Sequence, residues 1–364
     1  MLFRFVVRLI AFTSIALVMT EFFLRIIPSG FQYPRRLQYS NEDGIGVVLG
    51  KNLRIKYRNA CTGNTVFSTN RFGMRDPERA IEKQGKRIAF LGDSIVEAAQ
   101  VNDADVVSRL LEKELGHDVL NFGIGGVGTV QERLLYENKV RTFAPDVVVL
   151  FFNTDNDVSD NSLSLAHIIY PGKSFLTFRD EEGAPYSEIS YTRLKTAKQY
   201  LLNHFAFFRL IQQRISSVKT ADTASLPFIS VTSSTGSRVD TIRQELFLVS
   251  PDNDFEAAWQ TTEKELIALK KEVKDDGAVF KVVLVPTTYT EDQFVHKPSF
   301  MAMRGDRAVQ IHYPRERLLD IFHRNEIDTI DLEGIITPEL TFGCDPHWTA
   351  DGHKKVADTL RYAF

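Results

Sequence analysis

Four short stretches of the sequence carry the side chains that could do chemistry. They are Gly92–Ser94, Asn121–Thr129, Asn153–Asn161 and Cys344–His353. Between them they supply a serine hydroxyl, several glycine amides, asparagine side chains and an Asp/His pair. A serine becomes a nucleophile when a nearby histidine takes its proton, and a carboxylate fixes the tautomer of that histidine. These residue types together predict acyl transfer through a covalent serine intermediate.

Each role in such a reaction has one best candidate. Ser94 is the candidate nucleophile, His347 is the candidate base, and Asp345 is the carboxylate that orients the histidine. Pro346 stands between Asp345 and His347 and restricts the backbone on both sides. The spacing of the Asp/His pair is therefore stiff, which suits two side chains that must hold one geometry.

The glycine-rich stretch has two interpretations. Gly123, Gly125 and Gly128 satisfy the GxGxxG pattern of dinucleotide-binding proteins. The pattern follows the second predicted strand, however, and no acidic residue closes the next strand at the usual distance of about 20 residues. We therefore predict that these glycines allow a tight turn and present amides to a developing oxyanion. The backbone amide of Ser94 and the side chain of Asn156 are the other candidate donors.

Five apolar runs predict the strands that position these residues. They cover 87–93, 118–124, 145–154, 279–287 and 327–332. Helical patterns cover 95–101, 106–116, 129–143, 193–215, 254–277 and 349–364. Strands that alternate with helices and are apolar on both faces predict an α/β fold with a central parallel sheet covered on both sides. Ligands collect at the carboxyl ends of such strands, which is where the chemical residues stand.

The regular pattern stops between residues 158 and 250, and we interpret this region as an insertion. Its Ser/Thr-rich part, 216–237, is typical of a long loop. The predicted organisation has three parts. An anchor occupies 1–30, an extension that packs on the core occupies 31–85, and one domain with the insertion occupies 86–364.

The first thirty residues differ in composition from the rest. An apolar run from Leu9 to Met19 follows Arg4 and Arg8, and Glu21 and Arg25 stand near its far end. A spanning helix needs about 20 mostly apolar residues, and charged side chains near its ends can reach the headgroups. No small-x-small cleavage site follows the run, so an uncleaved anchor is favoured over a cleaved signal peptide. We expect the chain after residue 30 in an exported compartment.

Composition and cysteine usage indicate which kind of protein this is and which partners are expected. Of the 364 residues, 43% are hydrophobic and 25% are charged, as in globular proteins. The formal net charge is −3 and no basic patch stands out, so nucleic acid is not an expected partner. Cys61 and Cys344 are the two cysteines. They form a disulfide in an oxidising compartment or remain two separate thiols, and the sequence leaves both open.

In this order, the four stretches resemble the sequence blocks of the GDSL or SGNH hydrolases, a superfamily of serine esterases and acyltransferases. The matching residues are Gly92-Asp93-Ser94, Asn121–Gly126, Asn156-Asp157 and Asp345–Trp348. Asp345 and His347 are two residues apart rather than three, as in the DxHW variant of membrane-linked polysaccharide O-acetyltransferases. Thr154 stands where the family usually has glycine. The resemblance covers residues 66–160 and 255–362 and leaves the insertion without a counterpart.

This resemblance implies a flavodoxin-like three-layer α/β/α sandwich and a site without cofactor or metal. It points to Gly126 as the glycine donor of an oxyanion hole shared with Ser94 and Asn156. The N-terminal segment and the stretch Asn70–Asp76 resemble a bacterial, membrane-anchored subgroup with a periplasmic or extracellular catalytic domain. The implied substrate is an acetyl or other acyl ester of a cell-surface carbohydrate. The implied partners are the membrane and a membrane-embedded acyl donor.

Two classes of function remain after these steps. The first is a serine-dependent esterase or O-acyltransferase, and the second is a catalytically silent protein that binds glycan or serves as a scaffold in a membrane complex. A pure binding protein has no use for a complete set of Ser94, His347 and Asp345, so we favour the enzyme. Hydrolysis and transfer use the same residues, and the sequence does not separate them.

Overall fold

A computed structural model describes residues 2–26, 37–40, 42–169, 176–180, 182–187, 193–220, 244–290 and 304–364 of the chain. Its centre is a five-stranded parallel sheet with the strand order β11-β10-β7-β5-β6. The strands are β5 (Arg87–Gly92), β6 (Asp118–Gly123), β7 (Val147–Asn153), β10 (Val279–Val285) and β11 (Asp328–Asp331). Numbered along the chain, this order is 2-1-3-4-5, that of flavodoxin-like folds. The predicted parallel sheet is confirmed.

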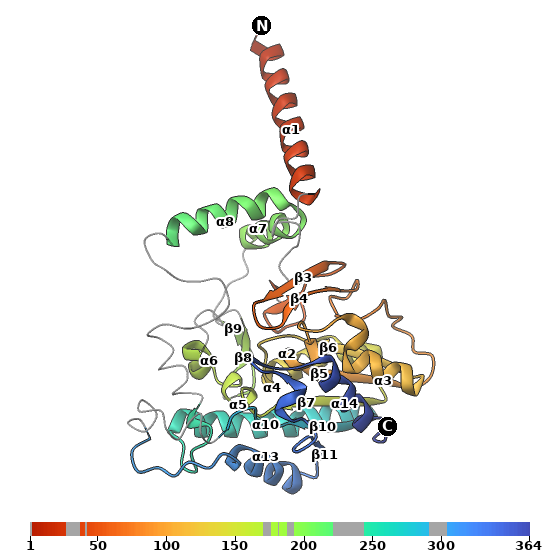
Figure 1. Ribbon diagram of the computed structural model, residues 1–364, viewed down its shortest axis with the longest axis vertical. Helices are drawn as coiled ribbons and strands as arrows, with labels where there is room; N and C mark the ends of the chain where they lie inside the picture. The colour runs from red at the N-terminus through yellow and green to blue at the C-terminus, as the bar shows by residue number, and fades with distance from the viewer. Residues whose placement is uncertain are drawn as a thin grey trace.

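Helices cover both faces of the sheet (Figure 1). Alternate strand residues point to opposite faces, so Leu91 and Leu150 belong to one apolar core and Phe90 and Phe151 to the other. The first core is completed by α4 (Thr129–Asn138), α10 (Asn253–Asp275) and α13 (Tyr313–Arg324). The second is completed by α3 (Val107–Leu115) and α14 (Ala350–Leu360). The three-layer α/β/α sandwich is therefore confirmed.

The helices differ in detail from the pattern in the sequence. After β5 the predicted helix at 95–101 is only α2 (Ser94–Glu97), because Ala98 takes a left-handed conformation with φ of 55° and ends it. A 3-10 turn at Asp103–Asp105 separates it from α3. The predicted helix at 129–143 likewise divides into α4 and a 3-10 turn at Val140–Phe143. Helix α13 is not among the predicted helices.

The segment before the last helix forms a β-hairpin, where no strand was predicted. After a 3-10 turn at Pro338–Leu340, strand β12 (Thr341–Phe342) pairs with β13 (Asp345–Trp348) in antiparallel register. Trp348 is fully buried, and its ring lies 6.4 Å from that of Phe151 on β7. This contact seats the hairpin on the central sheet.

The N-terminal part consists of one long helix and two small antiparallel sheets. Helix α1 (Leu2–Ile26) is followed by β1 (Leu37–Tyr39) with β2 (Val47–Leu49), and by β3 (Arg54–Asn59) with β4 (Gly63–Ser68). Ile55 and Phe67 of the β3–β4 hairpin pack against Ala99, which follows α2. Within α1, Phe3–Ile26 has a mean hydropathy of 1.8, and it is long and apolar enough for a membrane anchor or a signal sequence.

The segment after β7, which the sequence predicts to be an insertion, contains mostly short elements among its described residues. They are α5 (Asp157–Asp160), α6 (Leu163–Ile169), β8 (Thr177–Arg179), β9 (Pro185–Ser187), α7 (Arg193–His204) and α8 (Ala206–Thr220). The single helix predicted at 193–215 is thus two helices. They break at Phe205, where Glu21 of α1 accepts hydrogen bonds from the first two amides of α8. Residues 221–243 of the predicted Ser/Thr-rich loop lie outside the described residues.

Candidate active site

The loop after β5 buries an aspartate and leaves a serine accessible. Asp93 caps α2, because its Oδ1 accepts a hydrogen bond of 2.8 Å from the backbone N–H of Ile95. Ser94 is the first residue of α2 and is only half-buried, whereas Asp93 and Ile95 are buried. Asp93 therefore caps the helix, and the neighbouring Ser94 stays available as the candidate nucleophile.

Two glycines let the neighbouring loop approach Ser94. Gly123 pairs with Gly92 in the sheet, and a Cβ atom on Gly123 would lie 2.2 Å from the backbone nitrogen of Glu97 in α2. Gly126 has a φ of +84°, a conformation that L side chains rarely adopt. Among the described residues, none accepts a hydrogen bond from the backbone N–H of Ser94 or of Gly126. Adjacent strands thus bring two uncommitted N–H donors to one edge of the sheet.

His347 connects the serine to a carboxylate. Its Nε2 lies 2.8 Å from Ser94 Oγ, and its Nδ1 hydrogen-bonds Asp345 Oδ1. The backbone N–H of His347 also donates to Asp345 Oδ1, at 3.0 Å. The side chains of His347 and Asp345 are 18% and 12% exposed, so their hydrogen bond is largely shielded from solvent. Ser94, at the other end of the hydrogen-bond chain, is half-buried and remains accessible.

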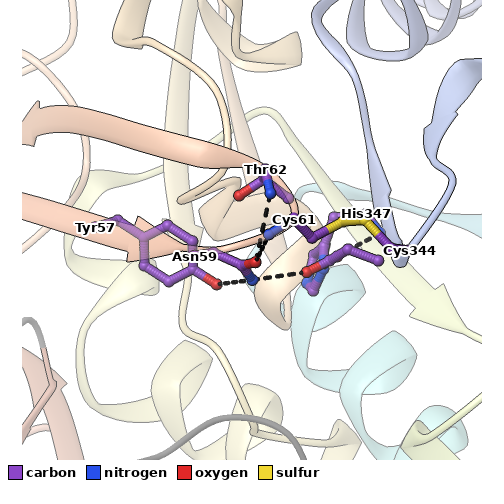
Figure 2. The surroundings of a disulfide bond; sticks show 7 residues. Tyr57, Asn59, Cys61, Thr62, Cys344 and His347 are labelled. Carbon is purple, nitrogen blue, oxygen red and sulfur yellow. Dashed lines mark hydrogen bonds and ion pairs between the residues drawn. A yellow bond between two sulfur atoms is a disulfide. The ribbon is translucent and has the colours of Figure 1, made fainter.

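The second oxygen of Asp345 is held by a residue from the N-terminal part. Asn59, the last residue of β3, donates from Nδ2 to Asp345 Oδ2 at 3.1 Å (Figure 2). Asn59 Oδ1 accepts in turn from the backbone N–H of Cys61, at 2.7 Å. Cys61 and Cys344 form a disulfide with a Cα–Cα distance of 5.8 Å, which joins the β3–β4 hairpin to the residue before Asp345. Asn59 was not among the predicted site residues. The only signal for it was the pair of cysteines, because Cys61 lies two residues after Asn59 and Cys344 lies one residue before Asp345.

These contacts set the charge of Asp345. Burial raises the pKa of its carboxyl, but hydrogen bonds from His347 and Asn59 and the attraction of His347 outweigh burial and lower that pKa below its usual value. An ionised Asp345 favours the His347 tautomer with a proton on Nδ1 and a lone pair on Nε2. That lone pair faces the serine hydroxyl, which is the arrangement a general base requires.

Asn156 lies close to the serine loop, but the NH2 group of its side chain already donates to two carboxylates. Its Nδ2 donates to Asp93 Oδ2 and to Asp160 Oδ2, each at 3.1 Å. Asn153, at the end of β7, also donates to Asp93 Oδ2, at 3.0 Å. The asparagines therefore hold Asp93 behind Ser94. The predicted contribution of Asn156 to an oxyanion hole stays a prediction.

Four fully buried carboxyl groups lie behind the serine loop. They belong to Asp93, Glu132, Asp157 and Asp160. Burial and the charges of its acidic neighbours raise the pKa of Glu132 well above its usual range, and the same causes raise that of Asp157. Neither carboxyl oxygen of Glu132 has a hydrogen-bond partner among the described residues. Among the residues that the structure describes, no group of three His, Cys, Asp or Glu side chains is arranged to hold a metal ion. Burial and mutual repulsion thus favour the protonated forms of Glu132 and Asp157.

Fold and site together define a doubly wound α/β protein with a Ser–His–Asp hydrogen-bond chain at the carboxyl edge of its sheet. Among solved structures, it is similar to an acetyl xylan esterase, with 16% identity, coverage of 76% of this chain and 98% of that chain, and a TM-score of 0.37. A GDSL-like lipase from Bacteroides thetaiotaomicron shows 14% identity, coverage of 76% and 87%, and a TM-score of 0.35. The lipase/acylhydrolase from Enterococcus faecalis shows 13% identity, coverage of 77% and 97%, and a TM-score of 0.37. No protein-family model matches the sequence, and no curated protein matches it.

Proposed function

We propose that this protein is a serine-dependent esterase or O-acyltransferase. The observation that carries the proposal is the continuous hydrogen-bond chain from Ser94 Oγ through His347 to Asp345. Two distant parts of the chain, one with Ser94 and one with Asp345 and His347, meet in the geometry that general-base activation of a hydroxyl needs. A purely structural role would not require the accessible serine at the end of this chain.

In the proposed first step, Ser94 Oγ attacks the carbonyl carbon of the ester while its proton moves to His347 Nε2. Asp345 keeps the proton on Nδ1 and stabilises the imidazolium. The tetrahedral intermediate then collapses, the ester C–O bond breaks, and His347 donates its new proton to the departing alcohol. In the second step an acceptor hydroxyl loses its proton to His347 Nε2 and attacks the carbonyl carbon of the acyl-serine. The bond between that carbon and Ser94 Oγ then breaks, and His347 returns the proton to Ser94 Oγ. Water as acceptor gives hydrolysis, and a sugar hydroxyl gives transfer.

The N–H groups of Ser94 and Gly126 are the donors we propose for the oxyanion of the tetrahedral intermediate. Their lack of acceptors among the described residues supports this role. Asn156 would join them only by exchanging one of its carboxylate partners for the oxyanion. Loss of one such donor typically raises the barrier by about 3 kcal/mol, so two backbone donors already supply a large effect.

We further propose an acetyl or other acyl ester of a cell-surface carbohydrate as the substrate. The resemblance of the Asp345–Trp348 block to the DxHW variant of membrane-linked polysaccharide O-acetyltransferases supports this choice. The apolar helix α1, as a membrane anchor, supports it too. The Cys61–Cys344 disulfide supports a periplasmic or extracellular location, because disulfides persist in oxidising compartments. For transfer, the acyl group would come from a donor embedded in the same membrane.

The test is turnover of p-nitrophenyl acetate by the full chain in detergent, with Ser94→Ala and His347→Ala as variants. Each variant should lower kcat by at least about 10³-fold. Ser250→Ala, at an exposed serine far along the chain, is the matched control and should leave kcat unchanged. Equal rates in all four proteins would contradict the serine mechanism. Addition of an oligosaccharide acceptor then separates the two reactions, because a transferase forms acetylated sugar at the expense of free acetate.

A further inference from the structure

Helices α7 and α8 have a basic sequence that the proposed reaction does not use. The Lys and Arg residues between 193 and 220 are Arg193, Lys195, Lys198, Arg209, Arg214 and Lys219. This stretch contains no Asp or Glu, although acidic residues outnumber basic ones by 47 to 44 in the whole chain. Basic amphipathic helices are typical of segments that lie on a membrane surface.

Exposed apolar side chains recur on α8 as far as Ile215. The large hydrophobic side chains that are more than a third exposed just before α8 and along it are Phe205, Phe208, Ile211 and Ile215. They recur at intervals of three or four residues, so they share one face of the helix. Helix α7 adds Leu194, which is 80% exposed. We call Leu194 and these four side chains the apolar stripe. Such a concentration of exposed apolar side chains marks a contact surface.

Helix α1 is bonded directly to the junction of α7 and α8. Glu21 accepts hydrogen bonds from the backbone N–H groups of Ala206, at 3.0 Å, and Phe207, at 2.9 Å. Arg25 donates from Nη2 to the carbonyl oxygen of His204, at 2.6 Å. Figure 1 shows α8 running across the end of α1 rather than along it. The last turns of α1 therefore fix where α8 begins.

The length of α1 sets the depth of this junction in a bilayer. The apolar segment has 24 residues and a rise of about 36 Å, which exceeds the roughly 30 Å of a hydrocarbon core. Glu21 and Arg25 stand in its last two turns, where charged side chains lie among the headgroups. A helix whose first amides are bonded to Glu21 begins at the same depth.

We propose that α7 and α8 lie in the headgroup layer of a membrane that contains anionic lipids. The apolar stripe faces the acyl chains, and the exposed Lys198 of α7 and Arg214 of α8 contact lipid phosphates. The inference rests on the proposed membrane anchor and gives the insertion a role, namely a second, in-plane attachment of the domain. Composition, exposure and the bonds to Glu21 and Arg25 are separate observations that favour lipid over a protein partner.

The test uses the full chain in nanodiscs, with single cysteines that carry an environment-sensitive fluorophore. Because Cys61 and Cys344 are paired, an introduced cysteine is the reactive one. Ile215→Cys reports on α8, and Phe12→Cys reports on α1. Ile81→Cys is the matched control, since Ile81 is 47% exposed and Ile215 is 54% exposed. Emission is quenched with nitroxide-labelled lipid or with aqueous iodide, in phosphatidylcholine alone and in equal parts phosphatidylcholine and phosphatidylglycerol.

We expect the label at 215 to shift to the blue and to be quenched by the lipid nitroxide, more strongly with phosphatidylglycerol present. The label at 81 should respond to iodide alone. Lipid quenching at 12 combined with iodide quenching at 215 would overturn the proposal and leave the anchor intact. Lipid quenching at 215 without quenching at 12 would support the in-plane helices and contradict the anchor. A label at 215 that neither quencher reaches would indicate a protein contact and would also overturn the proposal.

Discussion

The two sides of the Ser94–His347 hydrogen bond are built in different ways. The serine side belongs to the central sheet, where Gly92 and Gly123 pair and the loops that follow them carry Ser94 and Gly126. The Asp/His side lies on the small β12–β13 hairpin, outside the sheet. There Asn59 holds Asp345 across 286 residues of sequence, and a disulfide spans 283.

This difference shows where local sequence determines a site and where distant contacts do. Strand ends bring the serine and the glycine amides together because the sheet itself aligns them. No such regular element aligns Asp345. A hairpin with few buried residues is marginal alone, so its position depends on Trp348, Asn59 and the disulfide. Changes on the Asp/His side should therefore affect both stability and activity.

The largest effect in this comparison is expected from loss of the disulfide. The double variant Cys61→Ser with Cys344→Ser removes the covalent bond between the β3–β4 and β12–β13 hairpins. In the wild-type protein this disulfide closes a loop of 283 residues. The free energy of unfolding should fall by about 2–5 kcal/mol, and kcat should fall with it because Asp345 loses its support. Urea unfolding and p-nitrophenyl acetate turnover measure the two effects. Unchanged stability would mean that the hairpin holds its place without the bond.

A second effect concerns the buried acids on the serine side. Glu132 has a raised pKa, so the folded protein retains a proton that the unfolded chain releases above about pH 4.5. Stability from this group is present below that pH and is lost as the pH rises through the folded pKa. The glutamine in Glu132→Gln cannot titrate. The free energy of unfolding of this variant, relative to that of wild type, should therefore increase as the pH rises, by at most about 1.4 kcal/mol per pH unit. Parallel stability curves from pH 5 to pH 8 would contradict a protonated Glu132.

A smaller effect is expected from Asn59. Asn59→Ala removes one hydrogen bond to a charged group, worth about 1.5 kcal/mol, so kcat should fall about tenfold. Asp345 has a lowered pKa, and its ionised form is lost as the pH falls through that value. Without Asn59 this pKa rises, so the decline of kcat on the acid side should begin at a higher pH.

The control for Asn59 lies on the paired strand. Asn64 of β4 is exposed, and Asn64→Ala should match wild type in both kcat and its pH profile. A loss of stability in Asn59→Ala with an unshifted pH profile would assign Asn59 a structural role in the hairpin and no influence on Asp345.

The same comparison explains how much of the molecule can be predicted from its sequence. Strands β5, β6, β7 and β10 are mostly apolar runs with most residues buried, so they were visible in the pattern. Strand β11 is short and only partly buried, and the predicted run at 327–332 marked it through its flanking apolar residues. Asn59 could not be predicted, because the residues around an asparagine at the end of a hairpin strand do not indicate which distant side chain it will contact. The break between α7 and α8 also escaped prediction, since it depends on Glu21 of another helix.

The most direct test of the central claim is the site of covalent modification. The full chain is incubated with a fluorophosphonate ester, which traps an activated serine, and its peptides are mapped by mass spectrometry. The account predicts one adduct on Ser94 in the wild-type protein and its loss in His347→Ala. Turnover of the ester substrate with no adduct on Ser94, or with an adduct elsewhere, would contradict it.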